Sequence, residues 1–149
     1  MPMMSVPLFE RFFRSVAGLD LDRSDLKRFS DFVRQKTHDL LVVAEAAAKA
    51  NGRDVIVWRD LPITHGLERS IHDFQRIDKE IELRPVLEQL ATLPPLNLGI
   101  SEETQARLPT VVGGLSVALG RTLTIIDPKV RNPATEHWER AFRIFDLLL

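Results

Sequence analysis

The chain has 149 residues, of which 44% are hydrophobic, so it is long and apolar enough for one domain with a proper core and not for a disordered segment. It contains no cysteine, which excludes disulfides, thiolate metal sites and cysteine nucleophiles. The formal net charge of −1 argues against a generally basic DNA-packaging protein, because such proteins carry excess cations that neutralise phosphates.

The N-terminus lacks the basic start and long apolar core of a signal peptide. The most apolar run, residues 111–119, has about half the roughly 18 residues of a membrane span and contains Gly113 and Gly114. We therefore expect a soluble, cytoplasmic protein with no membrane partner.

Hydrophobic periodicity divides the first half into three helices. Residues 7–17 predict a short amphipathic helix that stops at Gly18. A long helix follows, capped by Ser24 or Asp25 and ended by the Asn51-Gly52 stop signal. Residues 54–58 are β-prone, and a third helix is predicted to begin at Asp60 as its N-cap.

The second half repeats this order less regularly. The pattern predicts a helix over residues 79–93, then a second long helix capped by Ser101, with a kink or a restart at Pro109. Residues 122–126 form the second β-prone run, and Asn132-Pro133 predicts the start of the last helix.

The segments 51–57 and 119–125 resemble each other, since each carries Gly-Arg between a long helix and a β-prone run. This order resembles the histone fold, in which an arginine after the long helix pairs with an aspartate seven positions on; here these are Arg53 and Asp60. Residues 7–18 also resemble the short first helix of archaeal histones. As a whole, the chain resembles a small bacterial family of tandem histone-fold proteins with no established function.

The resemblance implies an all-α fold in which two histone-fold repeats, residues 1–78 and 79–149, form a pseudo-dimer within one domain. It implies a short β-bridge segment after each long helix, and Arg53 and Asp60 as a structural clamp. In a histone pair the long helices cross near their middles, so Gly113-Gly114 would approach the alanines of residues 44–48. Alternatively, the glycines mark a kink after Pro109.

The resemblance also raises DNA binding, although the pattern departs from DNA-packing histones. These carry lysine and threonine after the loop arginine, where this chain has Asp54 and Val55. In the second repeat, Pro128 stands seven positions after Arg121, where the histone pattern has an aspartate. Besides Arg53, the candidate phosphate contacts are Arg11, Arg14, Arg23, Lys27, Arg28, Arg121, Lys129 and Arg131. The alternative is that these cations form surface ion pairs with nearby acids.

His65, Glu68 and His72 share one face of the predicted third helix. The two histidines are about 10 Å apart by helix rise, which is too far for one ion. We therefore expect an exposed polar stripe and no metal or cofactor. No phosphate loop, dinucleotide fingerprint or nucleophile elbow is present, so we expect no enzyme.

The sequence thus predicts a non-enzymatic binding protein whose partner is another protein or a second copy. The alternative is a nucleoid-associated protein that touches the DNA backbone without reading its sequence. Charge placement separates the two hypotheses. Arginines gathered on one edge without carboxylate partners favour DNA, whereas arginines paired with acids favour protein interaction.

Overall fold

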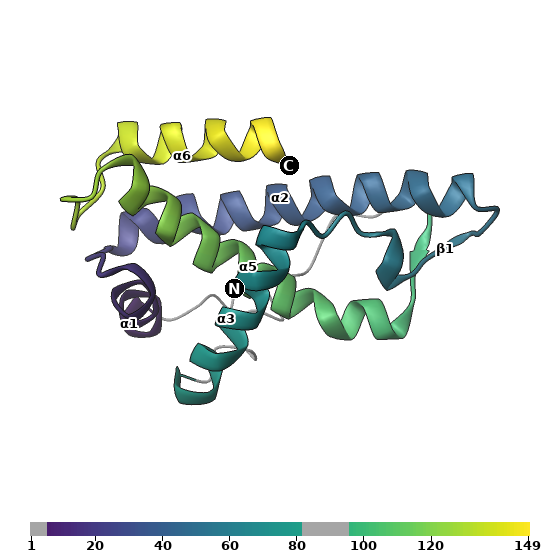
Figure 1. The fold of residues 1–149 in the computed structure, drawn as a ribbon, viewed down its shortest axis with the longest axis horizontal. Helices are drawn as coiled ribbons and strands as arrows, with labels where there is room; N and C mark the ends of the chain where they lie inside the picture. Colours follow the sequence, from purple (N-terminus) through teal and green to yellow (C-terminus); the bar gives the residue numbers. More distant parts are fainter. Residues whose placement is uncertain (1–5, 82–95) are drawn as a thin grey trace.

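The computed structural model describes residues 6–81 and 96–149, and within them it is mostly helical (Figure 1). The elements in chain order are α1 (Val6–Ala17), α2 (Arg23–Ala50), β1 (Val55–Ile56), the 3-10 turn η1 (Trp58–Asp60), α3 (His65–Ile81), β2 (Gly99–Ile100), α5 (Glu102–Ile126) and α6 (Thr135–Leu148). The helix expected over residues 79–93 lies outside the described residues beyond position 81.

The start of α2 differs from the prediction by a few residues. Its N-cap is Asp22, whose carboxylate accepts hydrogen bonds from the backbone N–H groups of Ser24 and Asp25 at 2.9 and 3.2 Å. The Asp25 carboxylate in turn accepts from the Asp22 N–H, which completes a capping box. The expected caps Ser24 and Asp25 are therefore residues of the first helical turn.

The other end of α2 follows the sequence signal. The chain leaves the helix at Asn51 and turns at Gly52, whose φ of 71° favours glycine. The prediction that α3 begins at Asp60 is wrong, because α3 begins at His65 and Asp60 ends η1. There the Asp60 carboxylate accepts from the N–H of Val57 and from Arg53. The residues after this turn instead lead to Thr64, whose hydroxyl accepts from the N–H of Leu67 in the first turn of α3.

Two backbone junctions join segments that are far apart in sequence. The strands β1 and β2 pair in parallel, with Val55 opposite Gly99 and Ile56 opposite Ile100. At the other junction, the N–H of Asp20, just before α2, donates to the carbonyl of Arg131, just after α5, at 2.5 Å. The segment before each long helix thus pairs with the segment after the other long helix.

The prediction of a strand over residues 122–126 is wrong, since these residues form the last turns of α5. Within the helix, the hydroxyl groups of Thr122 and Thr124 donate to the carbonyls of Ala118 and Arg121 at 2.7 and 2.8 Å. The second strand therefore precedes its long helix, whereas the resemblance had placed it afterwards.

The core is built around α5, which continues through Pro109 without restarting. The atoms nearest to Gly113 and Gly114 on their open side belong to Phe74 and Ile71 of α3. By length and composition alone α5 is apolar enough to cross a membrane, but 67% of its most apolar window is buried inside the fold. That burial is typical of a core helix.

The last helix, α6, runs beside α2 in the same direction (Figure 1). Arg28 donates to Thr135 at 2.7 Å, and the indole N–H of Trp138 donates to Asp25 at 3.0 Å. Further along, the ring of Phe32 stacks on Phe142 at 5.3 Å. Polar and aromatic contacts therefore fix α6 on the first half of α2.

Candidate functional site

The loop after α2 is held by the arginine and the aspartate that the sequence singled out. Both terminal nitrogens of Arg53 donate to the two carboxylate oxygens of Asp60 at 2.6 Å, so the pair is bidentate. The Asp60 side chain is only 3% exposed. Its hydrogen bonds from Arg53, and then that from the Val57 N–H, lower the Asp60 pKa from 3.8 to about 2. The pair fixes β1 and η1 relative to α2.

The candidate DNA contacts lie on exposed or half-buried surfaces, and most of them face an acid. Asp20 lies between two of them, with Arg14 at 3.4 Å and Arg131 at 3.5 Å. Lys27 pairs with Asp31 one turn along α2 at 3.2 Å. The two ion pairs of Asp20 lie at the junction between the loop before α2 and the loop after α5.

Two further candidates are also paired. Arg28 approaches Asp25 at 3.3 Å, and Arg121 binds Asp73 of α3 at 2.6 Å. Hydrogen bonds from Arg121 and then Arg76 lower the pKa of Asp73. Arg121 therefore ties α5 to α3 and does not project freely into solvent.

Five of the eight candidates thus have a carboxylate partner: Arg14, Lys27, Arg28, Arg121 and Arg131. Within residues 6–81 and 96–149, the remaining candidates Arg11, Arg23 and Lys129 are exposed and form no ion pair. Most of these candidate phosphate contacts are therefore neutralised by carboxylates of the protein itself.

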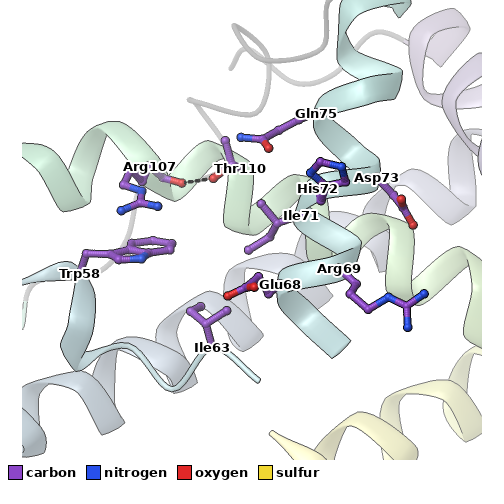
Figure 2. Close-up of a pocket in the computed structure, with 10 residues that line it drawn as sticks. All are labelled: Trp58, Ile63, Glu68, Arg69, Ile71, His72, Asp73, Gln75, Arg107 and Thr110. Atoms are coloured by element: carbon purple, nitrogen blue, oxygen red, sulfur yellow. Dashed lines mark hydrogen bonds between the residues drawn. The ribbon is translucent and has the colours of Figure 1, made fainter. Parts of the chain in front are cut away.

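A pocket of about 600 Å³ lies between η1, α3 and α5 (Figure 2). In its wall, the Arg107 guanidinium stacks 3.9 Å from the centroid of the Trp58 ring and approaches Glu103 at 3.6 Å. Arg107 carries no signal that could be read from the sequence, because its contact with Trp58 spans 49 positions of the chain and leaves no local spacing pattern.

Glu68 and His72 line this pocket and His65 does not. All three are exposed on α3. Over the part of the chain that the structure describes, no three His, Cys, Asp or Glu side chains come together in a group suited to a metal ion. Figure 2 shows Arg69 and Asp73 pointing away from Trp58. The pocket therefore places Trp58, Arg107, Glu68 and His72 around one hollow, without a hydrogen bond between Glu68 and His72.

Comparison with known proteins places the whole chain in one group of relatives. Residues 9–146 match the family model described as a domain of unknown function, DUF1931. Two proteins of Aquifex aeolicus (strain VF5), both described as uncharacterized, are 31% and 30% identical over 106 and 125 residues. The alignments cover 71% and 75% of this chain, and 62% and 72% of the relatives. The chain therefore spans less than two thirds of the first relative.

Two crystal structures are similar along nearly the entire chain. One, of a Thermus thermophilus protein, has a TM-score of 0.87 and 54% identity and covers 100% of both chains. Another, of an Aquifex aeolicus protein, has a TM-score of 0.83 and 27% identity and covers 96% of this chain and 94% of the other. The arrangement of elements is thus shared with proteins from these bacteria.

Proposed function

The chain belongs to the DUF1931 family, and from its fold and its ion pairs we propose that it is a non-enzymatic, cytoplasmic protein-interaction module. In this proposal its two halves form a histone-like pseudo-dimer within one chain. The partner is another protein or a second copy, and DNA is the alternative.

The reciprocal junctions support the pseudo-dimer. The segment after α2 pairs with the segment before α5 through β1 and β2. The segment before α2 pairs with the segment after α5 through Asp20 and Arg131. Two similar halves related by a two-fold axis would exchange contacts in this reciprocal way. The pairing therefore favours two related halves over an unrelated helical assembly.

The observation that carries the interaction function is that five of the eight candidate phosphate contacts are paired with carboxylates. Non-specific DNA binding derives its affinity from cations that displace counterions from phosphates. Here Arg14 and Arg131 share Asp20, and Arg121 is tied to Asp73. Binding DNA through these side chains would break ion pairs and bring carboxylates towards phosphates. A surface of mixed charge instead suits docking to proteins.

One observation favours the DNA alternative. Arg11, Arg23 and Lys129 are exposed and form no ion pair among the described residues. They belong to α1, to the start of α2 and to the loop between α5 and α6, which lie at the same end of the molecule in Figure 1. Three cations in one region are enough for a weak contact with a phosphate backbone.

Fluorescence anisotropy with a short DNA duplex across a salt series tests the choice. We expect no binding at physiological salt, because three unpaired cations support only a weak contact, which salt at that concentration screens. Micromolar binding that weakens steeply with salt, and that is lost when Arg11, Arg23 and Lys129 are changed to alanine, would establish the DNA role instead. Arg69→Ala is the control, since Arg69 is also exposed and unpaired within the described residues but lies on α3.

A further inference from the structure

One face of α2 is only half covered by α6. Asp25, Arg28, Phe32 and Lys36 lie along this face at helical spacing, and all contact residues of α6. The same spacing continues with Val43, Ala46 and Ala50, beyond the last residues of α6. Val43 is 48% exposed, and both alanines are exposed. The second half of this face is therefore a shelf of small apolar residues.

The outer face of α6 is apolar at its end. Trp138, Ala141 and Phe145 are buried on its inner side, whereas Leu147 and Leu148 are 85% and 74% exposed. Ile144, one turn earlier, is 38% exposed. Leu147 and Leu148 follow Ile144 by three and four positions, so these three exposed residues share one side of the helix. The end of α6 thus presents large apolar side chains next to a shelf that lacks them.

We propose that a second copy of this chain covers both surfaces. In the proposed dimer, a two-fold axis places the end of each α6 on the α2 shelf of the other copy. The dimer surface is defined as Ile144, Leu147 and Leu148 of α6 together with Val43, Ala46 and Ala50 of α2. This inference rests on the proposed interaction function and identifies the partner.

Helix geometry supplies the register of this dimer. Since both helices rise about 1.5 Å per residue, an antiparallel packing with Leu147 over Ala46 brings Arg143 near the end of α2 at Ala50. Arg140 then reaches the turn that contains Asp54. Arg140, Arg143 and Asp54 are exposed and form no ion pair within the described residues. This register therefore brings Arg140 towards the opposite charge of Asp54, and the two-fold axis repeats that pairing.

These features favour a second copy over other occupants. A two-fold interface requires that one surface carry both complementary parts, and here the protruding leucines and the small-residue shelf occur on adjacent helices. An anionic membrane would accept the leucines and arginines of α6 but would repel Asp54. A patch of about two turns from each copy is small, so the expected dimer is reversible, with a Kd on the order of micromolar.

Analytical ultracentrifugation of the full chain, from about 1 to 200 µM, tests the proposal. We expect a monomer–dimer equilibrium whose Kd rises about tenfold or more in Leu147→Gln, because the substitution removes a central apolar contact. The matched control is Ile125→Gln. Ile125 is 78% exposed but lies on α5, outside the dimer surface, so this variant should dimerise like the parent. Unchanged thermal unfolding shows that both variants keep the fold.

A charge exchange tests the register directly. Asp54→Arg should weaken the dimer several-fold by placing like charges together, and adding Arg140→Asp in the same chain should restore it. A chain that stays monomeric throughout the concentration range would overturn the proposal. A dimer whose Kd does not change in Leu147→Gln would also overturn it. So would binding of the parent chain to vesicles of anionic phospholipid, if Leu147→Gln abolishes that binding. The DNA titration tests the interaction function and does not depend on these results. A failure of the dimer proposal can therefore be distinguished from a failure of the proposed function.

Discussion

The pKa values of two buried aspartates, Asp60 and Asp25, are shifted in opposite directions. Asp60 receives two bonds from Arg53 and one from the backbone, which lower its pKa to about 2. The pKa of Asp25 is raised above its usual value, chiefly because burial disfavours its charge, although the Asp22 N–H and Trp138 partly compensate. Asp25 therefore stabilises the fold more as pH falls, whereas Asp60 contributes most when it is ionised. The same residue type serves as a charged clamp in one place and as a buried acceptor in the other.

Asp60→Asn should lower the free energy of unfolding at neutral pH by about 3 kcal/mol, because it removes one partner of a largely buried pair. Since the folded pKa is depressed from 3.8 to about 2, this stability is present above pH 3.8 and is lost as pH falls towards 2. Urea unfolding of both proteins between about pH 2 and 7 measures the difference.

Asp31→Asn is the control for this clamp. Asp31 is 63% exposed and pairs with Lys27 within one helix, so we expect a loss below about 0.5 kcal/mol. Equal losses in the two variants, or a difference between Asp60→Asn and the parent that does not depend on pH, would show that the clamp does not stabilise the loop through its charge.

At the scale of elements, the packing of α3 on α5 depends on two glycines. An added Cβ at Gly113 would collide with the ring of Phe74, and one at Gly114 with the side chain of Ile71. Gly113→Ala should therefore destabilise the protein by about 1–3 kcal/mol through overpacking, despite the better helix propensity of alanine. Thermal and urea unfolding measure the loss.

Gly66→Ala makes the same change where α3 has open space, since nothing lies within 4 Å of the added Cβ. Alanine should there stabilise the helix by about 0.5–1 kcal/mol. Opposite signs for the two variants are the expected result. A stabilised Gly113→Ala would mean that α3 does not approach α5 this closely.

Local signals predict the elements best where no distant contact competes with them. The phenylalanines of α1, the stop at Asn51-Gly52 and the Ser101 cap act within a few residues, and the structure has them as expected. Residues 122–126 are rich in β-branched side chains, but the fold extends α5 through them, with Leu123 fully buried. Tertiary burial therefore overrode strand propensity there.

The same distinction holds for the candidate site. The Arg53–Asp60 spacing is seven residues and readable in the sequence, whereas Asp20–Arg131 and Asp73–Arg121 join residues more than forty positions apart. A single sequence carries no signal for such pairs. The cations that could have formed a basic face therefore became a set of ion pairs only when distant elements were brought together.

At the scale of the whole molecule, the two halves of the chain interlock. The buried face of α3, from the first half, packs on α5, from the second. The last helix, α6, in turn packs on α2 of the first half. Within the described residues, each half therefore buries apolar side chains against the other.

Residues 1–78 expressed alone should therefore not give a stable monomer. Without α5 and α6, this fragment exposes Phe74 and Ile71 from α3 and Phe32 from α2, all of which are buried in the full chain. We expect weak helical circular dichroism without cooperative unfolding, or association of the fragment with itself. Adding residues 79–149 should restore a cooperative transition, because the two fragments supply each other's core. A monomeric fragment that unfolds cooperatively by itself would contradict the interlocked arrangement and would make the first half an independent domain.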